Sequence, residues 1–402
     1  MTISLSSPDI GELELLYVNS ALRSRSLSLG PWLQRFEDRI AEYTGAHYAV
    51  AVNSGTSALH LCVRAMGIGP GDEVITTGFS FVASVNCLLY EGAHPVFVDI
   101  DLDTFNIDPD KIREFLAEDC TRSRDGRVIH RATSRTVKAI LPVHVFGLPC
   151  DMDAIAAIAK EYGLGILEDA CEAFGTRLSA RYAGTFGDAG VFAFYPNKQI
   201  TTAEGGVVVT DDARIAEECR SMRNQGRDAD GQWLRHVRLG FNYRLSELHC
   251  ALGAAQLDRA DELLAMRRGV AAQYNIQLRA ESHIHLPVSI PAVTKSWFAY
   301  VIQLRNGPGS AFRDRIRERL RQQGVPSQVY FPTIYSEPYF EPYLETLPRK
   351  LPHTERAAET CMALPFSSVL TEGEVRTVCT ELSNALDGEV HGEQAVAAAP
   401  GA

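Results

Sequence analysis

VFAFYPNKQITTAEGGVVVT, the stretch from Val191 to Thr210, contains the pattern from which the fold and chemistry of this chain can be predicted. An apolar run ends at Pro196, a lone lysine follows at Lys198, and a β-branched run begins after Gly205 and Gly206. This order predicts a strand, a loop that presents Lys198, and a second strand. Apolar surroundings disfavour the charged form of a lysine, which suits a nucleophile that forms a Schiff base. The alternative is a solvated lysine at a strand end.

A second stretch, LGILEDACEAFGT, places a carboxylate where a ligand is expected. Its apolar strand ends at Asp169, which lies 29 residues before Lys198. Ligands of open α/β sheets bind at the carboxyl ends of strands. A carboxylate there could pair with the protonated ring nitrogen of pyridoxal phosphate, although a solvated loop carboxylate would have the same sequence.

A third stretch, AVAVNSGTSALHL, predicts a strand, a small polar turn and a helix. Backbone amides at the start of such a helix, with the hydroxyls of Ser54, Thr56 and Ser57, suit a phosphate group. The same hydroxyls could instead cap the helix. Taken together, the lysine, the carboxylate and the phosphate turn predict a pyridoxal phosphate site.

Six blocks, in order along the chain, resemble the DegT/StrS-like sugar aminotransferases, which are pyridoxal phosphate enzymes of fold type I. The resemblance extends from about residue 30 to the early 370s, and it is carried by NSGTSAL, GDEVITTGFSFVASVNCLLYEGAHPVFVDID, PVHVFGLPCDMDAI, EDACEAFGT, FAFYPNKQITTAEGGVVVT and LGFNYRLSELHCALGAAQL. It implies an α/β fold: a large domain with a mainly parallel sheet covered by helices, and a smaller C-terminal α+β domain.

The order of strands and helices supports this organisation, because alternation with nearly continuous apolar strands is typical of a parallel sheet covered on both faces. We expect an N-terminal segment, residues 1–30, that contributes to the active-site and small-domain region. A large cofactor-binding domain is expected over 31–250 and a small domain over 251–387, joined by one long helix from about Ser246 to Ala272. Residues 388–402 have the composition of a disordered tail.

Composition excludes several classes of function. The chain has 402 residues, 46% of them hydrophobic, and a formal net charge of −11 without a Lys/Arg-rich run, so nucleic-acid and membrane binding are not expected. The N-terminal residues do not form a signal peptide, which predicts a cytoplasmic protein. Nine cysteines without a CxxC pair favour neither a disulfide framework nor a metal site.

The resemblance assigns roles to individual residues. Lys198 corresponds to the lysine that carries the cofactor as a Schiff base and moves the proton during transfer. Asp169 corresponds to the aspartate that pairs with the pyridinium nitrogen, and Gly55, Thr56 and Ser57 to the phosphate-binding turn.

Three further residues correspond to cofactor or substrate contacts in the family. Phe81 matches the aromatic ring that lies against the cofactor, with a buried core phenylalanine as the alternative. Asn242 and Arg244 match a block that reaches the cofactor phosphate or substrate phosphates of the neighbouring subunit, which implies a homodimer with shared active sites. A polar side chain there could instead cap the helix that starts near Ser246.

Two positions depart from the commoner family pattern. Ala193 occupies a place where many relatives have a serine that contacts the phosphate, so that contact is missing or supplied elsewhere. Glu172 occupies a place next to the ring and the substrate where His or Gln is frequent, and it could be either a contact there or a surface or capping residue. Glu168 should point to the opposite face of the strand and be structural.

The resemblance implies a pyridoxal phosphate-dependent aminotransferase with ping-pong kinetics. The donor would be an amino acid, expected to be L-glutamate, and the acceptor a keto-sugar, expected to be a nucleotide-linked 3-keto or 4-keto hexose. The segments Ser24 to Gly30 and Gln328 to Tyr335 are the predicted sugar pocket.

Alternatives within the family are an aminocyclitol (inosose) aminotransferase and an aminobenzoate-type synthase. The family's sugar dehydratases replace the lysine by histidine, so Lys198 disfavours that activity. A non-catalytic regulatory protein of the same fold is disfavoured by the presence of both Lys198 and Asp169.

Overall fold

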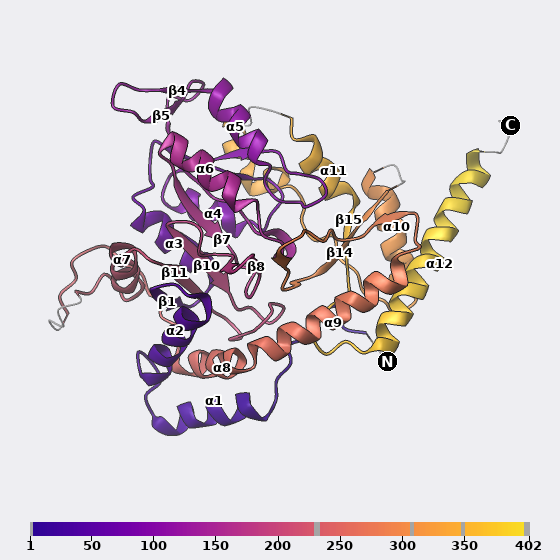
Figure 1. The fold of residues 1–402 in the computed structure, drawn as a ribbon, viewed down its shortest axis with the longest axis horizontal. Coiled ribbons are helices and arrows are strands. Elements are labelled where there is room, and N and C mark those ends of the chain that lie inside the picture. Colours follow the sequence, from indigo (N-terminus) through magenta and orange to yellow (C-terminus); the bar gives the residue numbers. More distant parts are fainter. Residues whose placement is uncertain (1–2, 229–233, 306–308, 347–349, 398–402) are drawn as a thin grey trace.

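The computed structural model describes residues 3–228, 234–305, 309–346 and 350–397 (Figure 1). Its main sheet is mixed. The order along the path of the sheet is β1 (Tyr48–Val52), β11 (Gly206–Thr210), β10 (Ala189–Ala193), β7 (Gly165–Asp169), β6 (Thr136–Ile140), β2 (Asp72–Thr77) and β3 (His94–Val98). Neighbours from β10 to β3 are parallel, whereas β11 is antiparallel to both β1 and β10. The predicted mainly parallel sheet is confirmed.

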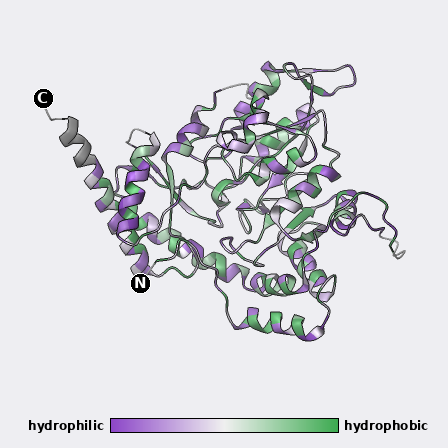
Figure 2. Cartoon of the chain, turned by 180° about the vertical axis from the view of Figure 1, so that it is seen from behind, coloured by the Kyte–Doolittle hydropathy of each residue, from purple (hydrophilic) through white to green (hydrophobic). Residues whose placement is uncertain are grey.

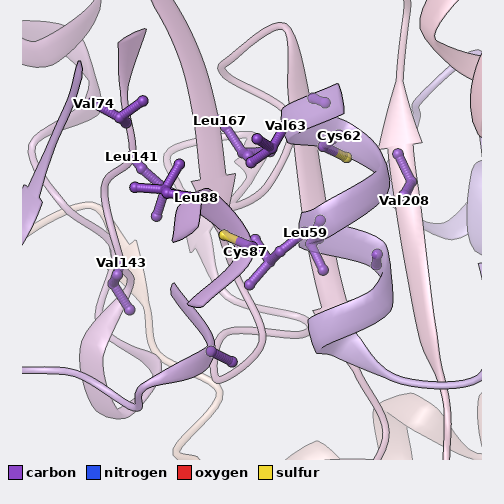
Figure 3. Packing of buried hydrophobic residues seen from close by; sticks show 14 of the residues in the cluster. Leu59, Cys62, Val63, Val74, Cys87, Leu88, Leu141, Val143, Leu167 and Val208 are labelled. Carbon is purple, nitrogen blue, oxygen red and sulfur yellow. The ribbon is translucent and has the colours of Figure 1, made fainter. Parts of the chain in front are cut away.

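Helices cover both faces of this sheet because apolar residues alternate between two cores. Val191 and Val208 point into the core formed with α3 (Gly55–Ala65), α4 (Ala83–Tyr90) and α7 (Ala213–Arg223), part of which Figure 3 shows. Phe192 and Val207 point into the opposite core, with α2 (Pro31–Thr44) and α8 (Glu247–Asp258). The helices α5 (Pro109–Glu118) and α6 (Met152–Tyr162) pack on that same face further along the sheet.

Shorter elements complete the large part of the molecule. They are α1 (Glu12–Ser24), which packs on α8, the hairpin of β4 (Cys120–Arg122) and β5 (Val128–His130), the 3₁₀ turn η1 (Val145–Gly147), and a small sheet of β8 (Arg177–Leu178), β9 (Arg181–Tyr182) and β13 (Val293–Thr294). The β4–β5 hairpin extends the main sheet through antiparallel pairing of β5 with β6.

A second core lies in the C-terminal part of the chain. An antiparallel sheet of β12 (Ile284–His285), β14 (Tyr300–Leu304) and β15 (Cys361–Leu364) packs with α9 (Ala260–Leu278), α10 (Gly309–Gln322) and α12 (Glu372–Ala397). The connecting elements are η2 (Ile334–Ser336), η3 (Pro338–Thr346) and α11 (Pro352–Thr360). This arrangement is the predicted smaller α+β unit, and Figure 1 shows α9 leading to it from α8.

The predicted long helix from about Ser246 to Ala272 is wrong in one respect, since the structure contains two helices with a break at Arg259. Arg259 has φ −105° and ψ 6°, which interrupts the helical backbone between α8 and α9. Its guanidinium forms ion pairs with Asp9, Glu14 and Glu262. These contacts tie the break to the N-terminal segment.

The predicted disordered tail also differs from the structure, because α12 continues through Ala397. Glu389, which is 7% exposed, accepts hydrogen bonds from Arg315 and Arg319 of α10. Two charge-assisted contacts hold this turn of the helix against its neighbour. Residues 398–402 of the predicted tail lie outside the described ranges.

Glu168 has the structural role that alternation along β7 predicted. It is fully buried, and its carboxylate accepts hydrogen bonds from the backbone N–H groups of Gly184, Phe186 and Gly187. His144 Nδ1 accepts from the Cys150 N–H, so its Nε2 is the atom that donates to Glu168 at 2.9 Å. One carboxylate thus fixes two loops at the end of the sheet.

Replacing Glu168 with alanine should lower the free energy of unfolding by about 3 kcal/mol, because several buried donors lose their acceptor. The control is Glu161→Ala, which removes an exposed carboxylate paired with Arg113 and should change stability by less than about 1 kcal/mol. The measurement is denaturant unfolding of both variants. Equal effects of the two substitutions would contradict the structural role of Glu168.

Candidate active site

A cavity of about 440 Å³ lies where the carboxyl ends of β7 and β10 meet the N-terminus of α3. Residues from the C-terminal unit close its other side, so it is shared by both parts of the molecule. It is lined by Ser54, Gly55, Thr56, Ser80, Phe81, Ala83, Val143, Asp169, Cys171, Glu172, Ala193, Tyr195, Asn197, Lys198, Glu204, Gly205, Phe298, Tyr330 and Phe331.

Lys198 lies on the loop between β10 and β11, as the sequence predicted. Its side chain is 13% exposed, and Nζ lies 4.0 Å from the centroid of the Phe298 ring and 3.7 Å from Glu172 Oε1. The amine therefore faces an aromatic ring and one carboxylate. A solvated lysine at a strand end does not describe this environment.

Asp169 ends β7 and lies 5% exposed at the cavity wall. Its Oδ2 accepts a hydrogen bond of 2.7 Å from Ser84 Oγ, and its Oδ1 accepts from the Cys171 N–H at 3.1 Å. Ser84 Oγ in turn lies 2.9 Å from Ser80 Oγ. Both oxygens of Asp169 therefore accept hydrogen bonds from neighbouring groups of the protein.

The start of α3 has the predicted turn, although its hydroxyls have different roles. Gly55 and Thr56 line the cavity. Ser54 is the helix N-cap, with Oγ accepting from the Ser57 N–H, and the Ser57 hydroxyl lies 2.9 Å from Ser54 Oγ. Ser57 is therefore engaged in the cap, and it does not line the cavity.

Close packing explains why glycine occupies position 55. A Cβ atom built on Gly55 would lie 2.7 Å from Ala193 Cβ. At this distance either the α3 turn or strand β10 would have to move. The backbone of the α3 turn and that of β10 thus approach each other directly. Amide groups at this helix N-terminus form a site of positive potential at the cavity.

Phe81 is 61% exposed and lines the cavity, so the alternative of a buried core phenylalanine is wrong. An aromatic face is thereby available to a planar ligand.

Asn242 and Arg244 do not line this cavity. Arg244 Nη1 donates to Asn224 Oδ1 at 3.0 Å, and Asn242 pairs with Asn224 through an isolated β-bridge. The alternative that either residue caps α8 is wrong, because Ser246 is the N-cap and accepts from the His249 N–H. Asn242 is exposed and Arg244 is partly exposed.

Glu172 is buried within the cavity wall. Its Oε2 accepts a hydrogen bond of 2.9 Å from the Phe146 N–H, while Oε1 is directed toward Lys198. Burial raises the pKa of Glu172 to about 7, and Lys198 and the Phe146 N–H act in the opposite direction. The alternative of a surface or capping residue is wrong for Glu172.

Sequence reasoning missed several cavity residues. Tyr330 and Phe331 belong to the predicted segment Gln328 to Tyr335, whereas the segment Ser24 to Gly30 contributes nothing to the cavity of its own chain. Ser84 does not line the cavity but donates to Asp169, and its block resembles the family without a local signal for this contact. Phe298 is separated from Lys198 by about a hundred residues, so only the folded chain brings them together.

Metal-binding groups and membrane-spanning helices were searched for in the described ranges. In that part of the chain no group of three or more His, Cys, Asp or Glu side chains is arranged to hold a metal ion. None of its helices combines the length and the apolar character that crossing a membrane requires.

Comparison with known proteins identifies the family. The model of the DegT/DnrJ/EryC1/StrS aminotransferase family matches residues 8–383. GDP-perosamine synthase from Caulobacter vibrioides is 36% identical over 391 residues, which cover 96% of this chain and 98% of that protein.

Solved structures agree with this assignment. PseC from Helicobacter pylori, an aminotransferase involved in the biosynthesis of pseudoaminic acid, is 27% identical with a TM-score of 0.86, over 96% of this chain and 100% of that one. Spr1654 from Streptococcus pneumoniae, solved in its PMP form, is 25% identical with a TM-score of 0.87, over 98% and 100%. The chain therefore belongs to the DegT/DnrJ/EryC1/StrS aminotransferase family, as its six sequence blocks predicted.

Proposed function

We propose that this aminotransferase uses pyridoxal phosphate to move an amino group from L-glutamate to a nucleotide-linked 3-keto or 4-keto hexose. The observation that carries the proposal is the cavity in which Lys198, Asp169 and the N-terminus of α3 meet. The similarity to GDP-perosamine synthase and to PseC supports a sugar as acceptor. Two half-reactions that share one site give ping-pong kinetics.

The residues of the cavity fit pyridoxal phosphate. Lys198 supplies an amine, Asp169 an anion for a protonated ring nitrogen, and Phe81 an exposed aromatic face for a planar ring. The amides of Gly55 and Thr56 at the start of α3 suit the phosphate. When bound, the cofactor supplies an electron sink for the carbanion formed at the amino-acid carbon.

In this proposal the protein residues transfer the proton, balance the charge of the ring nitrogen and exclude water. Lys198 takes the proton from the amino-acid carbon and returns it, because its amine lies beside Glu172 and Phe298 within the cavity. Asp169, held by Ser84, remains an anion and keeps the ring nitrogen protonated. Tyr330 and Phe331 narrow the cavity from the C-terminal side and exclude water.

The low number of cationic side chains in the cavity supports a site that a second subunit completes. Of the described residues that line it, Lys198 is the only one of cationic type, whereas Asp169, Glu172 and Glu204 are carboxylates. A phosphate and a nucleotide diphosphate need further donors, and arginine is well suited to both. We propose that Asn242 and Arg244 of a second copy provide them, which requires a homodimer.

The surface of the molecule is consistent with a second copy. Leu15, Leu16 and Leu22 on α1 and Leu239 in the loop before Asn242 are between 50% and 71% exposed. In Figure 2, α1 lies at the lower edge of the molecule and has hydrophobic turns. Three exposed leucines on one helix favour burial of α1 against another protein surface.

The first prediction concerns Lys198. The native protein should bind pyridoxal phosphate with a visible absorbance band that bleaches on addition of glutamate, and borohydride reduction should leave the cofactor mass on the peptide containing Lys198. Lys198→Ala should lose both signals because it removes the only proposed attachment amine. Lys160→Ala, at an exposed lysine of α6, is the control and should behave as the native protein. Equal cofactor attachment without Lys198 would exclude the proposal.

The second prediction concerns the support of Asp169. Ser84→Ala removes a hydrogen bond to a charged group and should raise the Kd of pyridoxal phosphate by about tenfold. Ser80→Ala is the matched control, since Ser80 contacts Ser84 and not Asp169, and it should have a smaller effect. Fluorescence titration measures both constants. If the two variants bind equally well, Ser84 has no special role at Asp169.

The third prediction concerns the shared site. Lys198→Ala and Arg244→Ala should each be nearly inactive as homodimers. Mixed dimers contain one site with both residues intact, so random exchange should restore about a quarter of native activity. Activity is measured after unfolding and refolding the variants together, with each variant refolded alone as control. No recovery in correctly assembled mixed dimers would show that Arg244 does not act across subunits.

A further inference from the structure

Glu172 is fixed in the cavity wall by a contact that leaves one of its oxygens for Lys198. Oε2 accepts from the Phe146 N–H at 2.9 Å, and Oε1 lies 3.7 Å from Lys198 Nζ. Phe146 itself has a positive φ of 54° in the 3₁₀ turn η1, so its N–H is held in an uncommon backbone conformation. The carboxylate has little freedom to turn away.

Within the described residues, Glu172 is the carboxylate that lies within ion-pair distance of Lys198. The ring of Phe298 packs 4.0 Å from Nζ on another side. An ammonium group with a single buried counter-charge interacts strongly with that charge, because little water screens the pair.

Other titratable groups near Glu172 keep a constant charge near neutral pH. Burial raises the pKa values of Cys171 and Tyr330 well above their usual range, so both stay uncharged. Burial lowers the pKa of Arg267, which faces Tyr330, to about 10, and the guanidinium stays charged. Asp169 is the remaining neighbouring carboxylate, and its oxygens are bound by Ser84 and the Cys171 N–H.

We propose that Glu172 is a positioning residue that holds the Lys198 amine in the cavity and controls how much of it is uncharged near neutral pH. The functional meaning rests on the proposed function above, in which Lys198 must exist both as an amine and as an ammonium. The resemblance to the family left this carboxylate without a role, whereas the contacts to Phe146 and Lys198 assign one.

The sign of the effect follows from the charge of Glu172. Its pKa of about 7 means that it is an anion above that pH and neutral below it. As an anion it forms an ion pair with the Lys198 ammonium, which slows reaction of the amine, whereas the neutral form does not. In Glu172→Gln this counter-charge is absent at every pH, while the side chain keeps its length and an acceptor for the Phe146 N–H.

The experiment is trace acetylation of the cofactor-free, full-length protein with acetic anhydride, followed by mass spectrometry of the Lys198 peptide. The rate at Lys198 is divided by the rate at the exposed Lys160 of the same sample. The pH is varied from about two units below to about two units above the pKa of Glu172. Glu172→Gln should label Lys198 about tenfold faster than the native protein at the high end and equally fast at the low end.

Two variants separate charge from shape. Glu204→Gln removes another carboxylate of the same cavity, one without an ion pair to Lys198 in the described structure, and should leave the ratio nearly unchanged. Glu172→Asp keeps the charge and should label more slowly than Glu172→Gln at high pH. The proposal would be overturned if the difference in Lys198 labelling between Glu172→Gln and the native protein did not change with pH. Equal labelling of Glu172→Asp and Glu172→Gln at high pH would also overturn it.

The outcome is distinguishable from failure of the proposed function. Cofactor attachment to Lys198 is measured by adding pyridoxal phosphate to a portion of the same native preparation and reducing it with borohydride. Attachment with no pH-dependent difference in acetylation would overturn the role of Glu172 and leave the aminotransferase proposal standing. A pH-dependent difference without attachment would support the Glu172–Lys198 pairing and contradict the use of pyridoxal phosphate.

Discussion

The arrangement of the site depends on two adjacent buried carboxylates at the end of one strand. Side chains alternate along β7, so Glu168 and Asp169 leave the sheet in opposite directions. Glu168 collects backbone donors from the turn before β10 and fixes the sheet from the side opposite to the cavity. Asp169 enters the cavity, where Ser84 holds it. The neighbouring strand β10 then leads to the loop that presents Lys198.

Local sequence patterns were sufficient for the large-domain side of the site. A strand ending in a carboxylate, a polar turn before a helix, and a lysine between two apolar runs each have a local physical cause, and these features meet at one edge of the sheet. The capped start of α3 belongs to the same group, whereas Phe81 was indicated only by the resemblance to the family. The mainly parallel sheet followed from its nearly continuous apolar strands.

Features that depend on distant contacts could not be predicted in this way. Phe298 and Tyr330 reach the cavity only because the C-terminal unit packs against the large one. The break at Arg259 depends on carboxylates near the N-terminus, and the extension of α12 depends on arginines of α10. A role for Glu172 could be proposed only from its distances to Lys198 and Phe146 in the folded chain.

The contact between the α3 turn and β10 has an evolutionary consequence. A Cβ at position 55 would overlap the Cβ of Ala193, so the freedom to vary either residue depends on the other. Glycine at position 193 would not by itself make room, because the same Cβ would also lie 3.0 Å from Cys171 Sγ. Variation at position 55 is therefore limited by two neighbours at once, so a change at either neighbour alone does not release it.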